Sequence, residues 1–261
     1  PIDSITGLLR TGEYHTAPMP VISYRGRIWR AVECARSNTD IWGKRYSAMI
    51  ISAPDSADLL QAASWSVTDS LPYDSTYLDG KFGAWLEGNA VVTPDGNVAD
   101  LLRVDYAPGP EYAALIRLRD SVSFDPFDPE KNFVRMPGGA KKFTVRYDSL
   151  SGRYWSLVNY VTQEWAGKQN PAWVRNTLAL SSSPNLQEWT VHRTVLHHPD
   201  IAKHGFQYAD WLFDGNDIVL LSRTAYDDNG TGAHNCHDAN YMTFHRIKDF
   251  RKALTEQAGN R

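Results

Sequence analysis

The sequence has few cysteines and no long apolar or basic runs, and each scarcity excludes a class of protein. Only Cys34 and Cys236 occur in 261 residues, so there is neither a disulfide framework nor a C-x-x-C metal motif. No apolar stretch approaches the length of a transmembrane helix. No run of Lys and Arg dominates any segment, and the formal net charge is -3. This charge balance argues against a nucleic-acid-binding protein, and we expect no membrane partner either.

The composition that remains is that of a globular protein rich in aromatic residues. Hydrophobic residues make up 42% and charged residues 22% of the chain, which is enough for a sizeable core. Nine Trp and thirteen Tyr are a high aromatic content; β-strand cores favour such residues, and stacking on sugars is the alternative. The chain opens on Pro1 and has no signal-peptide pattern, so we expect a processed or cut sequence.

Four hairpin signals recur along the chain. Two apolar runs flank a tight turn at Arg25-Gly26, Asp95-Gly96, Ser151-Gly152 and Asp214-Gly215. Glycine accepts a positive φ at little cost, which makes such turns strong hairpin signals. The turns lie roughly 60 residues apart, which leaves room for two further strands in each unit, as in a β-propeller blade with long loops.

The second half of each unit also indicates strands. Segments 48–67 and 177–196 each read as strand, Ser and Pro, Leu, Trp and strand, while YAALIRLRD with NFVRM and the segment YMTFHRI supply outer strands elsewhere. Helix is expected only in DSADLLQAAS and in the tail DFRKALTEQ. We predict an all-β fold, a β-propeller of four-stranded antiparallel blades with about four blades visible. A single domain over residues 1–261 is expected, and missing N-terminal blades are one explanation for the low blade count.

Polar residues gather at one end of the predicted strands, whereas the other end carries ordinary turns. The first strands contribute His15, Glu87, Lys142 and Gln207; the second strands contribute Arg30, Glu33, Arg103, Asp105, Asn159 and Arg223; the last loop contributes His237 and Asp238. Charges also cluster at any solvated rim, but that does not explain an arginine at the second-strand end in three of four units. We therefore expect a polar pocket at the mouth of the propeller.

Carboxyl groups in this set predict glycoside hydrolysis, which commonly needs one protonated and one ionised carboxyl group at the scissile bond. Glu33, Glu87 and Asp105 are the candidates, with Glu87 in WLEGN the best placed. Neighbouring carboxylates raise one another's pKa, which would keep one protonated near neutral pH. The alternative for Glu87 is a rim carboxylate paired with Lys142 or Arg103.

The arginines predict recognition of a carboxylate on the sugar, because a guanidinium binds a carboxylate through two parallel hydrogen bonds. Arg30, Arg103 and Arg223 form this set, and His15, Lys142, Asn159 and Gln207 complete the substrate-binding residues. The alternative is that the arginines pair with neighbouring acids, Arg30 with Glu33 or Arg103 with Asp105.

His237 and Asp238 form a second candidate for proton transfer, since a carboxylate orients and supports an imidazolium. Chemistry based on histidine would indicate a polysaccharide lyase or a hydrolase with an unusual catalytic group. His234, His237 and Asp238 are a weak metal pattern, and DPFDPEKN lacks the spacing of an EF-hand, so calcium is not supported. We expect no metal and no cofactor.

Several segments resemble the sialidase-like, BNR-repeat propeller proteins of polysaccharide-degrading bacteria. They are YHTAPMPV, WLEGNAVVTPDG, RNTLALSSSPNLQEWTVHR, GFQYADWLFDG and SRTAYDD with HNCHDANYMTFHRI. The resemblance runs from about Pro1 to Arg251. It implies a six-bladed fold of which this chain is the C-terminal part, an exo-α-sialidase or sialidase-like glycosidase, and a secreted or periplasmic location.

The chain departs from that family at its Asp box, S-x-D-x-G-x-x-W. Ser182, Pro184, Leu186 and Trp189 occupy those places, so only the Ser and the Trp remain. Because of the arginine set, we expect an acidic oligosaccharide or polysaccharide as substrate. A non-catalytic carbohydrate-binding propeller and a lyase are the alternatives. A propeller that is not closed would expose strand edges and favour self-association.

Overall fold

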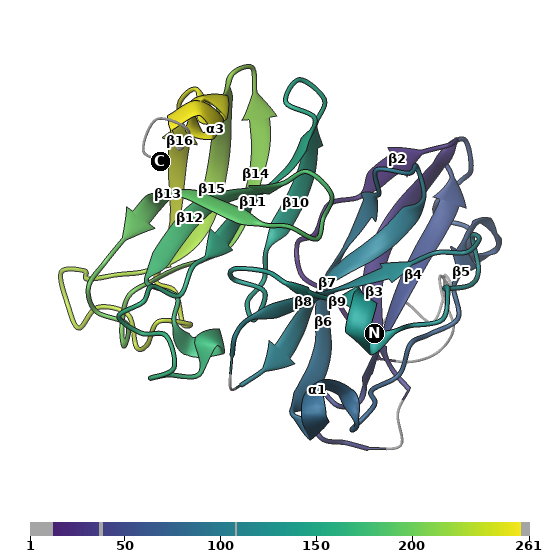
Figure 1. Ribbon diagram of the computed structural model, residues 1–261, viewed down its shortest axis with the longest axis horizontal. Helices are drawn as coiled ribbons and strands as arrows, with labels where there is room; N and C mark the ends of the chain where they lie inside the picture. Colours follow the sequence, from purple (N-terminus) through teal and green to yellow (C-terminus); the bar gives the residue numbers. More distant parts are fainter. Residues whose placement is uncertain (1–12, 37–38, 108, 257–261) are drawn as a thin grey trace. The chain divides into compact units, whose positions relative to one another are not determined.

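The computed structural model describes residues 13–36, 39–107 and 109–256, and nearly all of its regular structure is antiparallel β-sheet (Figure 1). The chain divides into two compact units, Pro1–Tyr106 with Ala113–Val134, and Ala107–Tyr112 with Arg135–Arg261. The described residues form four sheets, each antiparallel throughout. No helix among them is long and apolar enough to cross a membrane.

The first unit contains two sheets. In the first, β1 (Tyr14–His15) and β2 (Ile22–Tyr24) both pair with β3 (Arg27–Ala35), which is followed by β4 (Tyr46–Pro54) and β5 (Ser66–Val67). The second has the order β6 (Phe82–Val92), β7 (Val98–Tyr106), β8 (Tyr112–Arg117) and β9 (Phe133–Arg135). Apart from the pairing of β1 with β3, neighbours in these sheets are neighbours in the chain, as the hairpin pattern predicts.

The second unit contains the other two sheets. The third has the order β10 (Thr144–Asp148), β11 (Arg153–Asn159), β12 (Thr177–Ser183) and β13 (Thr190–His197), and the fourth has β14 (Gly205–Asp214), β15 (Asp217–Ala225) and β16 (Tyr241–Ile247). Short helical turns lie at α1 (Tyr77–Gly80), α2 (Pro129–Asn132), α3 (Ala253–Glu256), η1 (Ala62–Ser64), η2 (Pro171–Trp173) and η3 (Phe250–Lys252). The fourth sheet has three described strands where four were expected.

All four hairpin turns lie where the sequence predicts them. Each turn glycine has a positive φ, from +62° at Gly215 to +79° at Gly96. A Cβ at Gly152 or Gly215 would meet no atom within 4 Å, so these glycines are needed for backbone conformation and not for space. Of the two helices expected from sequence, the first is reduced to η1, and the tail forms η3 and α3.

The first strand is interrupted in three of the four sheets. Residues 16–21 separate β1 from β2, and register shifts occur between Leu86 and Asn89 in β6 and between Gln207 and Asp210 in β14. A β-bulge re-aims side chains and bends the strand. It places Glu87 and Tyr208 at φ +54° and +50°, conformations that non-glycine residues seldom adopt.

Aromatic residues fill the core of each unit, as their abundance predicts. Trp85 is fully buried in the first unit, stacked on Phe133 with ring centroids 5.8 Å apart. Trp155 and Trp211 belong to one buried cluster of the second unit. Trp42 and Trp173 are more than half exposed and are the tryptophans free to meet a ligand. The expectation of a single domain stays a prediction.

The ion pair of Asp148 with Arg251 fastens the C-terminal turn to the third sheet, with Arg251 Nη2 2.7 Å from Asp148 Oδ1. Hydrogen bonds from Arg251, with those from Ser151, outweigh burial and lower the pKa of Asp148 to about 2. The folded-state pKa lies below the unfolded value, so this stabilisation is present above about pH 4 and is lost as the pH falls toward 2.

We expect Asp148→Asn to lower the free energy of unfolding by about 1–2 kcal/mol near neutral pH and by much less near pH 2. Chemical denaturation at several pH values measures this difference. Glu188→Gln, in an exposed turn, is the control and should leave stability unchanged. An equal loss for Asp148→Asn at all pH values would contradict the linkage.

Candidate functional site

In the first unit, Glu33 of β3 joins three strands through one buried carboxylate. Its side chain is fully buried, and Oε2 lies 3.1 Å from Nδ1 of His15 on β1. Its Oε1 accepts a hydrogen bond of 2.9 Å from the backbone amide of Gly88, inside the bulge of β6. Glu33 therefore both orients an imidazole and satisfies a backbone group that the bulge removes from the ladder.

Glu87 and Arg103 form an ion pair across the same bulge. Glu87 Oε2 accepts from Arg103 Nη1 at 2.7 Å, and both side chains are less than 10% exposed. The pairing of Glu87 with Arg103 that the sequence left open as an alternative is confirmed. A buried ion pair at a residue with strained backbone is typical of sites where a side chain is held for a purpose.

Asp100 of β7 is the residue of this region that sequence reasoning missed. It is fully buried, and neither carboxyl oxygen has a hydrogen-bond partner. Burial, with a smaller contribution from the charge of Glu33, raises the pKa of Asp100 well above its usual range. A Cβ on Gly88 would lie 2.6 Å from Asp100 Oδ2 and 2.8 Å from Ala31 Cβ, so this packing needs glycine at position 88.

His15 is the member of this group that reaches solvent, with 28% of its side chain exposed. The hydrogen bond to Glu33 raises the pKa of His15 against the effect of burial, and the charge of Glu87 raises it further. We call His15, Glu33, Glu87, Asp100 and Arg103 the carboxylate group. It contains a partly exposed imidazole, two buried carboxylates that pair with His15 and Arg103, and Asp100, a buried carboxyl group whose pKa is raised.

Arg30 does not belong to this group, and the predicted register of three arginines is wrong. Arg103 and Arg223 lie opposite Leu86 and Gln207, where each bulge begins. The corresponding place in the first sheet, opposite His15, is occupied by Glu33.

Arg30 lies three residues earlier than Glu33 and faces the interruption between β1 and β2. Its guanidinium donates to the carbonyl groups of Met19 and Ala17 and to Thr16 Oγ1, at 2.9–3.0 Å. Arg30 therefore holds residues 16–21, a structural role that replaces the predicted contact with substrate.

Asp105 is half-buried near the end of β7. It pairs in register with Ala84, and its carboxyl group packs on Gly83. The ion-pair partner of Arg103 in the structure is Glu87, which leaves the catalytic assignment of Asp105 a prediction without support from this geometry.

In the second unit, Lys142 and Asn159 are buried and bonded to the protein itself. Lys142 Nζ donates to Thr144 Oγ1 at 2.7 Å and to the carbonyl group of Ala209 at 2.8 Å. Asn159 Nδ2 donates to the carbonyl group of Phe206 at 2.6 Å. These partners fix the two side chains in the core, and the predicted contact of Lys142 and Asn159 with substrate stays a prediction.

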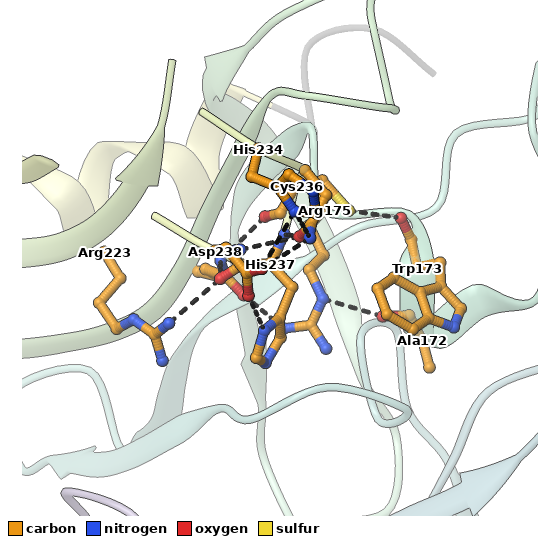
Figure 2. A network of polar contacts seen from close by, with 10 residues as sticks. Ala172, Trp173, Arg175, Arg223, His234, Cys236, His237 and Asp238 are labelled. Carbon is orange, nitrogen blue, oxygen red and sulfur yellow. Dashed lines mark hydrogen bonds and ion pairs between the residues drawn. The ribbon is translucent and has the colours of Figure 1, made fainter. Parts of the chain in front are cut away.

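Gln207 supports the 226–240 loop, which joins β15 to β16. Its Nε2 donates to the carbonyl groups of Cys236 and His237 at 2.8 and 2.6 Å. Arg223 Nη2 donates to the same carbonyl group of His237 at 3.1 Å, as Figure 2 shows. Gln207 is fully buried, so its effect on a ligand would be through the position of this loop.

His237 and Asp238 contact each other at the surface of this loop. His237 Nδ1 lies 3.1 Å from Asp238 Oδ1, and hydrogen bonds from His237 and Asn235 lower the pKa of Asp238. More than half of the Asp238 side chain is exposed, and a solvated pair of this kind has little electrostatic strength.

Tyr208 and Arg175 are two further residues that sequence reasoning missed. Arg175 is buried and donates to Gln207 Oε1 at 2.6 Å and to the carbonyl group of Ala172 at 2.9 Å. The centroid of the Tyr208 ring lies 5.9 Å from the guanidinium carbon of Arg175 and 4.8 Å from that of Arg223. The positive φ of Tyr208, in the bulge that matches that of Glu87, aims the ring at this place.

Trp173 completes this set of side chains (Figure 2). It is 54% exposed, and its ring lies 6.3 Å from that of His237. We call Arg175, Tyr208, Arg223, His237 and Trp173 the arginine–aromatic group. Two guanidinium groups beside exposed aromatic surface can bind an anionic sugar by charge and by stacking. A single pocket that unites this group with the carboxylate group stays a prediction.

The chain is similar in fold to glycoside hydrolases of known structure. It matches a GH32 β-fructofuranosidase from Bombyx mori over 82% of this chain and 44% of that one, with 14% identity and a TM-score of 0.52. A Bacillus subtilis levansucrase mutant matches over 93% of this chain and 69% of that one, with 10% identity and a TM-score of 0.57. A B. megaterium levansucrase mutant matches over 90% and 66%, with 11% identity and a TM-score of 0.55.

No protein-family profile matches the chain. No curated protein matches it either. The chain spans about 44% of the length of the B. mori enzyme.

These similarities confirm the all-β propeller fold and correct its detail. The matched glycoside hydrolases are five-bladed propellers and not six-bladed sialidases. The propeller architecture predicted from the hairpin repeat is therefore confirmed, whereas the blade number and the sialidase family implied by the resemblance are not what these structures support.

Asp100 offers a direct test of the electrostatics of the carboxylate group. Its pKa is higher in the folded than in the unfolded state. The wild type therefore has its full free energy of unfolding below the unfolded-state pKa of about 4, and part of it is lost as the pH rises through the folded-state pKa. Asp100→Asn stays neutral and keeps the shape, so we expect its melting temperature to gain several degrees on the wild type between about pH 4 and pH 8. Asp58→Asn, at an exposed turn, is the control. A difference that does not depend on pH would show that Asp100 is ionised in the fold.

Proposed function

We propose that the protein is a glycosidase that hydrolyses glycans with the carboxylate group. The observation that supports this most strongly is that one unit contains the Glu87–Arg103 ion pair, the Glu33–His15 pair and Asp100, a buried carboxyl group whose pKa is raised by burial. Glycoside hydrolysis needs a proton donor and an ionised group close together. The similarity to a β-fructofuranosidase and to levansucrases agrees with a carbohydrate substrate.

In this proposal His15 and Glu87 are the two residues that act directly on the glycosidic bond. His15, oriented by Glu33, gives a proton to the glycosidic oxygen as the bond from that oxygen to the anomeric carbon breaks. Glu87 supports the positive charge that develops on the sugar ring, and Arg103 fixes its position. Water then adds its hydroxyl group to the anomeric carbon and returns its proton to His15.

The arginine–aromatic group supports an acidic substrate such as a sialic or uronic acid. Arg223 is only partly buried and its guanidinium lies 4.8 Å from the ring of Tyr208, which pre-arranges it for a planar carboxylate. A sugar could stack on Trp173, which is exposed at the same place. A sialidase-like specificity, a secreted or periplasmic location and self-association remain parts of this proposal.

We expect Glu87→Gln to reduce hydrolysis by at least about 100-fold, since it removes the charge that the reaction requires. The measurement is release of the leaving group from sialosides, uronides, fructosides and neutral glycosides. Glu188→Gln, in an exposed turn, is the matched control and should keep full activity. Unchanged activity of Glu87→Gln on the preferred substrate would exclude the proposed role.

A binding module is the alternative if no substrate of the panel is turned over. In that case the wild type and Glu87→Gln should bind the same sugar with equal affinity, measured by calorimetry. Binding without turnover would leave the arginine–aromatic group as the functional part of the second unit.

A polysaccharide lyase is favoured by one specific observation, the Glu33-oriented imidazole of His15, which is the most exposed member of the carboxylate group that could accept a proton. A lyase removes the proton at C5 of a uronic acid and leaves a double bond in the product. Ultraviolet absorbance of that double bond distinguishes elimination from hydrolysis. His15→Ala should abolish either reaction, and only the product tells them apart.

Arg223→Lys tests the acidic specificity. Lysine keeps the charge and loses the planar guanidinium that lies against Tyr208. We expect Kd for an acidic sugar at the arginine–aromatic group to rise about tenfold, with little change for a neutral one. Arg193→Lys, outside both groups, is the control. Equal losses on acidic and neutral sugars would mean that Arg223 acts only through the loop that it supports.

A further inference from the structure

A cluster of histidine and aspartate side chains lies at one end of the fourth sheet, and the proposed function makes no use of it. His198, Asp200 and His204 lie in the connection from β13 to β14, and each has a ligand atom within 4.8 Å of the others. Asp227, at the start of the 226–240 loop, is 3.5 Å from His204 through its Oδ2. Four groups of the kind that bind metals therefore come from two loops.

His204 supplies an atom that lacks a partner. Its side chain is 6% exposed, and Nε2 is buried without a hydrogen bond. The ion-pair distance of 3.5 Å to Asp227 Oδ2 is not accompanied by hydrogen-bond geometry. A buried nitrogen without a hydrogen bond lowers the stability of the fold. A cation bound between this nitrogen and the neighbouring carboxylate would satisfy it.

Asp200 fixes the state of His204 in which Nε2 can bind a cation. Its Oδ2 lies 2.7 Å from Nδ1 of His204, so this nitrogen carries the proton in the neutral ring and Nε2 presents a lone pair. A carboxylate bonded to the far nitrogen of a histidine ligand is the usual support of zinc-binding imidazoles.

We infer that His204 Nε2, Asp227 and His198 form a site for a divalent transition-metal ion of the zinc type, with Asp200 as the supporting carboxylate. Two ligand atoms of a tetrahedral zinc ion lie about 3.3 Å apart, close to the 3.5 Å between His204 and Asp227. Imidazole nitrogen with carboxylate oxygen favours zinc over magnesium or calcium.

His198 is the third ligand, and it joins by releasing one hydrogen bond. Its ring stacks on that of His204 with centroids 3.5 Å apart, and its Nδ1 now accepts from the backbone amide of Asp200 at 3.1 Å. To direct a nitrogen toward the ion, this ring has to rotate out of the stack, because the two ring planes differ by only 14°. We therefore expect His198 to contribute less to affinity than His204.

The position of Asp227 is set before any ion binds. The neighbouring Tyr226 exchanges two hydrogen bonds of 3.0 Å with the side chain of Asn240 at the far end of the loop. The ring of Tyr226 packs edge-on against both histidines, at 5.4 and 4.9 Å. An ion here would join the loop that carries His237 to the connection before β14.

Titration of the tag-free chain with zinc chloride near neutral pH tests the inference. We expect one zinc ion per chain by calorimetry and a zinc-dependent rise in melting temperature, with no rise for magnesium. His204→Ala should abolish both effects. Asp227→Asn, whose side chain is 75% exposed and so folds normally, should weaken binding at least about tenfold.

His234→Ala is the matched control, because His234 is an exposed histidine of the same loop, 3.5 Å from Asp238. It should bind zinc as the wild type does. Loss of binding in His234→Ala with retention in Asp227→Asn would overturn the inference and assign the ion to the loop surface. No zinc binding by the wild type would also overturn it.

Discussion

The interruption of the first strand is the constraint on which both functional groups depend. A break in a ladder frees backbone groups that must find other partners when they are buried. In the first sheet Arg30 binds the carbonyl groups of residues 17 and 19. In the second sheet Glu33 accepts a hydrogen bond from the amide of Gly88. In the fourth sheet Lys142 donates one to the carbonyl group of Ala209. In each case a charged side chain from inside the same unit supplies the missing bond.

This arrangement explains why so many charged residues are buried without being catalytic. Lys142 is 2% exposed and bonded to Ala209 and Thr144, and its charge is matched to backbone dipoles. Glu87 and Arg103 are instead bonded to each other, and Glu87 has a strained backbone. A strained residue such as Glu87, whose side chain bonds another side chain, is a better sign of function than a buried charge such as Lys142 that bonds backbone groups.

The sequence predicts the fold well because its signals are local. The turn glycines and the alternation of apolar residues mark each hairpin, and the strand pairs from Arg27 to Ile247 follow them. The bulges carry no such mark. The one-residue shifts in β6 and β14 give Glu87 and Tyr208 a positive φ that the sequence does not reveal. The predicted register of Arg30 fails on the second strand of the first sheet, where Glu33 lies opposite His15.

The residues that sequence reasoning missed share a physical reason. Asp100 lies in the first half of β7, away from the strand end where the sequence places the polar pocket, and only the packing of Gly88 and Glu33 around it shows its burial. Tyr208 reads as one more aromatic residue of a strand until its φ is known. Arg175 lies just before a strand, and its role is visible only from its hydrogen bond to Gln207, which is 32 residues away in the sequence.

The two functional groups differ in how firmly the fold holds them. The carboxylate group lies on strands, and His15, Glu33, Glu87 and Arg103 bond to one another or to backbone within one unit, so its geometry is set when the sheets form. In the arginine–aromatic group, His237 and Trp173 lie outside the strands, and the loop that carries His237 is held by Gln207 and Arg223 through its carbonyl groups. A ligand that engages Arg223 competes with that support. Binding at the arginine–aromatic group should therefore loosen or reset the 226–240 loop, and an ion that joins Asp227 to His204 would oppose that movement.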